Sequence, residues 1–176
     1  MSWFEKPATA PAGAPTDAVW AVCPSCKAYI AKKKWQAAGK VCPRCDYHER
    51  LPGRERIAML ADSGSFKEFG AEVGVNDPLN FKDASGSYAD KAKSAADKTG
   101  AGEAVLTGTA RIEKIAVVLA VMDFKFLGGS LGSGTGERIL LAAEKAVELE
   151  RPLIIVSASG GARMHEGIVS LMQMAK

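Results

Sequence analysis

The 176-residue sequence lacks any long hydrophobic run and any segment that looks like a secretory signal. No stretch approaches the roughly 18 consecutive apolar residues that a membrane-spanning helix needs. The first 18 residues are rich in alanine and proline and do not follow the basic-then-apolar order of a signal peptide. We therefore expect residues 1–18 to form a flexible lead, and we expect a cytoplasmic protein without membrane contact.

Cysteine is scarce, and all four copies fall in one segment, at Cys23, Cys26, Cys42 and Cys45. The two C-x2-C pairs are separated by fifteen residues, a spacing typical of a zinc ribbon. Each pair directs two thiolates at one point, so that two pairs complete a tetrahedron around a metal ion. Two disulfides are the alternative, which a cytoplasmic compartment disfavours. We predict a ribbon over residues 19–50 with one structural Zn²⁺, whose binding supplies most of the folding free energy of that segment.

Charge is unevenly distributed along the chain. Residues 1–56 hold ten Lys and Arg against five Asp and Glu, whereas residues 57–176 hold thirteen against fifteen. The basic excess could meet a nucleic acid or another anionic surface. A solvent-exposed basic surface around the predicted zinc ribbon explains the same excess equally well.

Two common nucleotide-binding motifs are absent from the glycine-rich stretch at residues 123–136. The stretch contains neither G-x-x-x-x-G-K-[ST] nor G-x-G-x-x-G, which excludes a P-loop and a dinucleotide fingerprint. What remains is a glycine loop ahead of a helix, where a ligand can approach the backbone closely.

Hydrophobic periodicity predicts an α/β protein after the ribbon. Two near-continuous apolar runs, at 115–122 and 153–156, are typical of strands buried on both faces. The order from residue 104 onward is β-β-α-β-α, which favours a sheet backed by helices. The predicted elements are helices at 53–64, 83–98 and 137–150, a short strand within 66–75, and strands at 104–112, 115–122 and 153–156.

The segment 152–167 combines a strand with a turn of small residues and an expected helix. Small residues occupy 157–161, and a helical pattern begins near Arg163. A glycine turn at a helix N-terminus points unpaired N–H groups outward, and the helix dipole strengthens their attraction for negative charge. Such a turn could hold a developing oxyanion, although a purely structural glycine turn fits the same pattern.

Three blocks of sequence together resemble the β subunits of the bacterial acetyl-coenzyme A carboxylase carboxyltransferase. They are the ribbon at 23–45, the loop FLGGSLG at 126–132, and SASGGARM at 157–164 with SLMQMAK at 170–176. The middle segment PLNFKD at 78–83 is also similar. The resemblance implies a crotonase-like (ClpP/crotonase) spiral ββα fold, incomplete, over residues 51–176.

The resemblance also implies a function. The β subunit binds acetyl-CoA, and an α subunit, in an α2β2 assembly, completes the site. A biotin carboxyl carrier protein and a biotin carboxylase supply carboxybiotin as the carboxyl donor. Transfer to the acetyl methyl carbon gives malonyl-CoA for fatty acid synthesis. The alternative is a nucleic-acid-binding zinc-ribbon protein with a non-catalytic crotonase-like remnant.

Site residues follow from the matched blocks. The backbone N–H groups of Gly160 and Gly161 are expected to bind the thioester oxygen as it becomes an enolate, each contributing about 3 kcal/mol. We expect Gly128, Gly129 and Ser130 to form a wall of the binding site beside the CoA arm. Arg163 either contacts a CoA phosphate or braces the turn. No side chain stands out as a general base, His165 included, and in the family biotin accepts the proton.

The end of the sequence departs from the family pattern, because family members continue well beyond the position of Lys176. We therefore expect a truncated chain that exposes apolar surface and is inactive alone.

Overall fold

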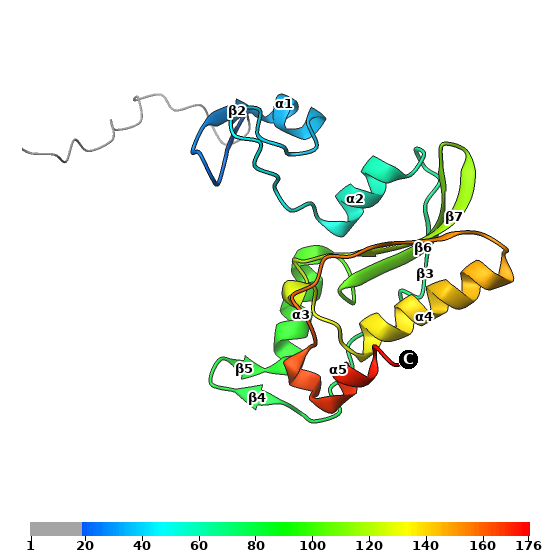
Figure 1. Cartoon of the computed structure of the whole chain (residues 1–176). Coiled ribbons are helices and arrows are strands. Elements are labelled where there is room, and N and C mark those ends of the chain that lie inside the picture. The colour runs from blue at the N-terminus through cyan, green and yellow to red at the C-terminus, as the bar shows by residue number, and fades with distance from the viewer. Residues whose placement is uncertain (1–18) are drawn as a thin grey trace, which may run out of the picture. The chain divides into compact units, whose positions relative to one another are not determined.

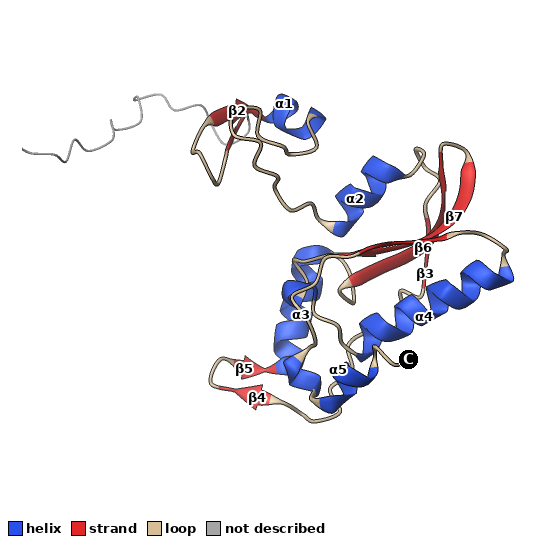
Figure 2. Ribbon diagram, in the orientation of Figure 1, coloured by secondary structure: helices blue, strands red, loops and turns tan. Residues whose placement is uncertain are grey.

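The computed structural model describes residues 19–176, so the predicted flexible lead at 1–18 lies outside the described residues. Two compact units divide the chain, the first ending at Arg50 and the second spanning Leu51–Lys176 (Figures 1 and 2). Within the part of the chain that the structure describes, no helix is long and apolar enough to cross a membrane.

The first unit is a small knuckle with little apolar core. Strands β1 (Trp20–Val22) and β2 (Tyr29–Ala31) pair antiparallel, and helix α1 (Lys32–Ala37) follows at once. Its buried cluster consists of two cysteines with one isoleucine and one tryptophan: Cys23, Ile30, Trp35 and Cys42.

The second unit is built on a four-stranded mixed sheet in the order β3-β6-β7-β8. Neighbouring pairs are antiparallel except β7 with β8, which run parallel. The long hairpin β6–β7 turns at Glu113 and Lys114, whose positive φ angles of 49° and 70° suit a two-residue hairpin turn. The strands are β3 (Lys67–Phe69), β6 (Val105–Ile112), β7 (Ile115–Met122) and β8 (Leu153–Val156).

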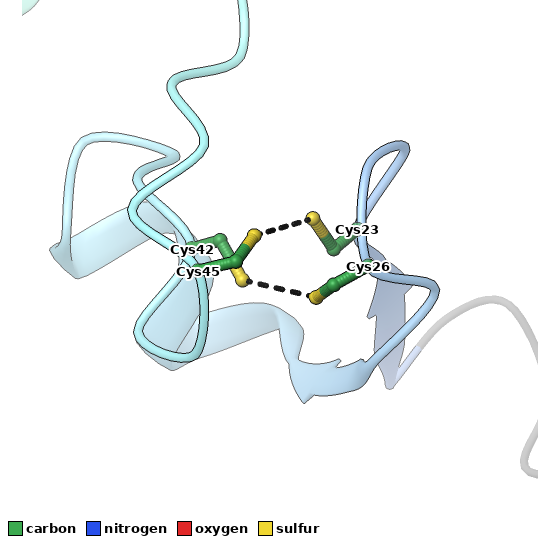
Figure 3. Close-up of side chains that lie close together, drawn as sticks. All are labelled: Cys23, Cys26, Cys42 and Cys45. Carbon is green, nitrogen blue, oxygen red and sulfur yellow. Dashed lines mark hydrogen bonds between the residues drawn. The ribbon is translucent and has the colours of Figure 1, made fainter.

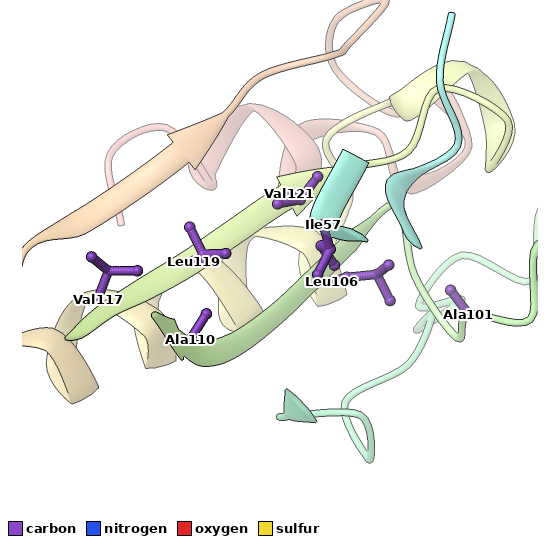
Figure 4. Packing of buried hydrophobic residues seen from close by; sticks show 7 residues of the cluster. All are labelled: Ile57, Ala101, Leu106, Ala110, Val117, Leu119 and Val121. Carbon is purple, nitrogen blue, oxygen red and sulfur yellow. The ribbon is translucent and has the colours of Figure 1, made fainter. Parts of the chain in front are cut away.

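Helices cover both faces of this sheet, as the apolar run of β7 predicts. Because side chains alternate along a strand, Val117, Leu119 and Val121 pack with Ile57 of α2 (Gly53–Leu60) on one face (Figure 4). On the other face, the intervening side chains of β7 pack against Ala142 and Ala146 of α4 (Ser133–Glu148). Each fully buried aliphatic side chain contributes roughly 1.5–3 kcal/mol.

Smaller elements connect these layers. The hairpin of β4 (Lys82–Asp83) and β5 (Gly86–Ser87) leads into α3 (Tyr88–Thr99), a helix that the Ser87 hydroxyl caps by accepting from the Asp90 N–H. Two single-turn 3-10 helices, η1 (Leu127–Gly129) and η2 (Met164–Glu166), follow β7 and β8, and α5 (Ile168–Met172) ends the described chain.

Three expectations about the end of the chain are wrong. Helix α4 begins at Ser133, four residues before the predicted start. Strand β8 is not buried on both faces, because Ile155 is 45% exposed. It is also an edge strand, since among the described residues only β7 pairs with it. No continuous helix starts near Arg163, because Gly167 adopts φ 57° and ψ −134°, outside the helical region, between η2 and α5.

Candidate functional site

Two glycine loops meet at one edge of the sheet. Strands β7 and β8 are parallel, so the loops that leave their carboxyl ends emerge side by side. The Gly160 N–H donates to the Gly128 carbonyl at 2.9 Å, and the Leu131 N–H donates to the Gly161 carbonyl at 2.8 Å. The Arg163 N–H returns a bond to the Leu131 carbonyl at 2.9 Å. The structure thus joins the two segments that the sequence nominated, 128–130 and 160–163.

Glycine is required in these loops for two different reasons. Gly129 has φ 65°, and a Cβ placed there would lie 1.9 Å from the Ala158 carbonyl oxygen, so the second loop occupies the space of a side chain. Gly161 has φ 120° and nothing within 4 Å of its would-be Cβ. The first glycine therefore permits close packing of the loops, whereas the second permits a backbone conformation at an open surface.

The two predicted oxyanion donors differ in their availability. The Gly160 N–H is held in the loop pairing by the Gly128 carbonyl. The Gly161 N–H donates to the exposed Ser159 hydroxyl at 3.0 Å, a local bond that rotation of that side chain can release. The predicted helix dipole behind the turn is absent from the described structure, because the backbone at Arg163 is extended before η2 begins.

The Arg163 side chain turns away from the surface. It is 1% exposed, and its guanidinium donates to both carboxylate oxygens of Glu103. It also donates to the Ser130 hydroxyl at 3.0 Å and to the Ser130 carbonyl at 2.6 Å. Burial opposes the charge, but the bonds to Glu103 outweigh it and hold the pKa of Arg163 above its usual value. These bonds connect Arg163 to the first glycine loop and to Glu103, and its guanidinium is enclosed by the protein.

Two buried carboxylates complete this network, and sequence reasoning missed both. Glu103 accepts from the Thr135 hydroxyl at 2.5 Å, at the start of α4. Glu166 accepts from the Tyr88 hydroxyl at 2.6 Å and from the Ser133 N–H at 2.5 Å. Burial, followed by the bond to Glu166, raises the pKa of Tyr88. One feature of the sequence could have prompted a search for these carboxylates. Arg163 stands in a loop of small residues, and a buried arginine needs a counter-ion.

His165 is partly buried and packs against two aromatic side chains. Its ring stacks on Tyr88 with centroids 4.8 Å apart and meets Phe81 edge-on at 5.2 Å. Burial lowers its pKa, and its buried Nδ1 has no hydrogen-bond partner among residues 19–176. The environment favours a neutral imidazole in a structural position.

The four cysteines converge in the first unit (Figure 3). Their sulfur atoms all lie within 4.8 Å of one another, and the Cys23–Cys45 and Cys26–Cys42 pairs are each 3.7 Å apart. A tetrahedron with bonds of about 2.3 Å has edges of about 3.8 Å, so the cluster fits a tetrahedral metal ion. The same distances far exceed the roughly 2.05 Å of a disulfide bond.

The thiols differ in their acidity. The N–H of Tyr47 lowers the pKa of Cys45 to about 7. For Cys26 the N–H of Ala28 acts in the same direction, but desolvation and the neighbouring sulfurs raise the pKa to about 11. Four thiolates so close together repel one another unless a cation neutralises them, which is what a bound metal supplies.

Comparisons with known proteins agree with this arrangement. Residues 48–176 match the family model of the carboxyl transferase domain. The acetyl-coenzyme A carboxylase carboxyl transferase subunit beta of Synechococcus sp. strain RCC307 is 45% identical over 100% of this chain and 62% of its own length. The subunit of the same name from Carboxydothermus hydrogenoformans is 49% identical over 91% of this chain and 56% of its own. The chain thus spans a little more than half of these relatives.

Solved structures give the same fold. A transcarboxylase 12S structure with hydrolysed methylmalonyl-coenzyme A superposes with a TM-score of 0.58 and 28% identity, covering 81% of this chain and 23% of that one. The geranyl-CoA carboxylase β subunit of P. aeruginosa gives a TM-score of 0.52 at 21% identity, covering 82% and 22%. The predicted α/β, crotonase-like fold class is confirmed.

Proposed function

Because the chain belongs to the carboxyl transferase domain family, we propose that it is the acyl-CoA-binding part of an acetyl-CoA carboxylase carboxyltransferase β subunit. Together with an α subunit it transfers the carboxyl group from carboxybiotin to the methyl carbon of acetyl-CoA, giving malonyl-CoA. A biotin carboxyl carrier protein and a biotin carboxylase provide the carboxybiotin. The observation that carries the proposal is the joined pair of glycine loops at the carboxyl ends of β7 and β8.

The reaction needs a donor where negative charge develops. Loss of a methyl proton places charge on the thioester oxygen. The methyl carbon then forms a bond to the carboxyl carbon as the bond from the biotin nitrogen to that carbon breaks, and the methyl proton ends on the freed biotin nitrogen. We assign the role of donor to the Gly161 N–H. On substrate binding, this N–H gives up its hydrogen bond to the Ser159 hydroxyl and donates to the thioester oxygen instead. Gly160 then positions the turn through its bond to Gly128, and the loop that contains Gly128 borders the CoA arm. A fixed donor of this kind contributes about 3 kcal/mol in the transition state.

The buried network keeps this geometry. Arg163 ties the second loop to the first through Ser130 and to the segment that precedes β6 through Glu103. Because its guanidinium is fully enclosed, its function is positioning, and the substrate meets backbone rather than this side chain.

In the first unit, Cys23, Cys26, Cys42 and Cys45 would hold one Zn²⁺ as a structural ion. Four thiolates leave no open position, so the ion supplies folding free energy rather than catalysis. The alternative function, a nucleic-acid binder with a non-catalytic remnant, is less well supported, because the β-subunit relatives match the ribbon and the sheet unit together.

A direct assay tests the proposal. A version extended to the length of its relatives and combined with an α subunit should convert acetyl-CoA and carboxybiotin to malonyl-CoA, measured by incorporation of labelled carboxyl. Omission of either subunit should abolish the product. Failure of the complete mixture to carboxylate acetyl-CoA, with zinc and folding intact, would contradict the proposal.

A further inference from the structure

A pocket borders the first glycine loop on the side of helix α3. Its volume is about 490 Å³. Gly128, whose carbonyl accepts from Gly160, forms part of its wall, so the pocket adjoins the proposed acyl site directly. The lining residues come from the β4–β5 turn, from α3 and from the stretch after β7, and the charged ones are Asp90, Lys91, Lys98 and Lys125.

Two of the three lysines carry uncompensated charge. Lys91 is paired with Asp83 at 2.5 Å, and Asp90 accepts from the Ser87 hydroxyl at 2.6 Å as part of the helix cap. Lys98 and Lys125 are exposed, and among the described residues neither ammonium group has a hydrogen-bond or ion-pair partner. Two free ammonium groups from separate elements therefore line one concave site.

We propose that Lys98 and Lys125 bind the phosphates of coenzyme A, which places the phosphorylated adenosine end in this pocket and directs the pantetheine arm past Gly128 toward Gly161. The inference rests on the proposed acyl-CoA function and adds the residues that recognise the nucleotide end. Lysine suits this role because its compact, hydrated charge binds phosphate without requiring a fixed geometry. Phosphates are also the only charged groups of CoA, whereas the pantetheine arm is neutral.

The test measures binding to the 176-residue chain by titration calorimetry, with CoA, 3′-dephospho-CoA and pantetheine as probes. The variants are Lys98→Gln, Lys125→Gln and the double substitution. Lys93→Gln is the matched control, because Lys93 is exposed on the same helix but does not line the pocket. Each single substitution should weaken CoA binding about fivefold, since exposed charge pairs contribute at most about 1 kcal/mol. The double substitution should weaken it more than tenfold and flatten its salt dependence.

Pantetheine binding should be unchanged in every variant, and 3′-dephospho-CoA should fall between the other two probes. Equal CoA affinity in the wild-type chain and the double variant would overturn the phosphate subsite and leave the proposed function standing. The subsite would also be overturned, and the proposed function again left standing, if Lys93→Gln weakened CoA binding as much as the other substitutions. A wild-type chain that binds neither CoA nor pantetheine would overturn the subsite and the proposed function together.

Discussion

The two units of this chain are stabilised by different interactions. In the described part of the first unit, the buried core consists of four residues, and two of them are cysteines of the four-cysteine cluster. Sulfur atoms thus occupy positions that apolar side chains fill in a larger domain. The second has two apolar layers on either side of a sheet, and it also encloses an arginine with two glutamates. Loss of a metal should therefore affect one unit and loss of a buried charge the other.

The largest expected effect is that of metal removal. Chelation by EDTA or an equivalent agent should unfold residues 19–50, because metal binding supplies on the order of 10 kcal/mol in such knuckles. The amide signals of residues 51–176 should remain dispersed in an NMR spectrum. Restoring Zn²⁺ should refold the unit, and an apo form with an unchanged first unit would contradict the assignment of a structural metal.

Next in size is Arg163→Met, which leaves the carboxylate of Glu103 buried without its cation. Breaking a buried pair from one side costs about 3–5 kcal/mol. Chemical denaturation monitored by circular dichroism should show that loss in the free energy of unfolding of the second unit. Arg151→Met, at an exposed arginine, is the control and should change it by less than about 0.5 kcal/mol. Equal stability of the two variants would mean that the network does not hold the unit together.

A smaller effect is expected for Tyr88→Phe. The change removes the hydroxyl that donates to Glu166 and accepts from Arg163, while the ring can still stack on His165. The free energy of unfolding should fall by about 1–2 kcal/mol. Tyr29→Phe, at a tyrosine that is 59% exposed, should leave it unchanged. If the two substitutions behave alike, the Tyr88 hydroxyl does not contribute to the network.

The smallest effect concerns pH. The hydrogen bond from Lys91, followed by those from Ser85, lowers the pKa of Asp83. A depressed carboxyl pKa adds stability above its unfolded value of about 3.9, and that contribution is lost as the pH falls through the folded pKa. Carbon NMR of the Asp83 carboxyl should show ionisation persisting well below that unfolded value in the wild type. In Lys91→Gln the titration should move back toward the usual range, and an unmoved titration would contradict the pairing.

Sequence reasoning succeeded where the signal is local. The cysteine spacing predicted the cluster, and the apolar run at Ile115–Met122 predicted β7, because each depends on neighbours in the chain. It failed where contacts between residues far apart in the sequence determine the local structure. Helix α4 includes Gly134 and Gly136, poor helix formers, and the carboxylate of Glu166 accepts from the first N–H of that helix.

The same limit explains the missed part of the site. Arg163 and Glu103 are 60 residues apart and no motif links them, so their pairing emerges only from the fold. The glycine loops were recognised from their composition. Their hydrogen bonds to each other, which leave Gly161 as the more available donor, depend on strand order and could not be predicted from spacing.

The central claim is that the Gly161 backbone meets the acyl oxygen, and a pair of glycine substitutions tests it most directly. Gly161 and Gly86 have φ angles of 120° and 121°, and both have open space around a would-be Cβ, so valine imposes the same backbone strain at either position. In the extended chain with its α subunit, Gly161→Val should lower kcat about 100-fold or more, because the strain displaces the Gly161 N–H from the acyl oxygen and so removes one oxyanion donor. Gly86→Val should retain near-normal turnover, and equal kcat values for the two variants would contradict the account.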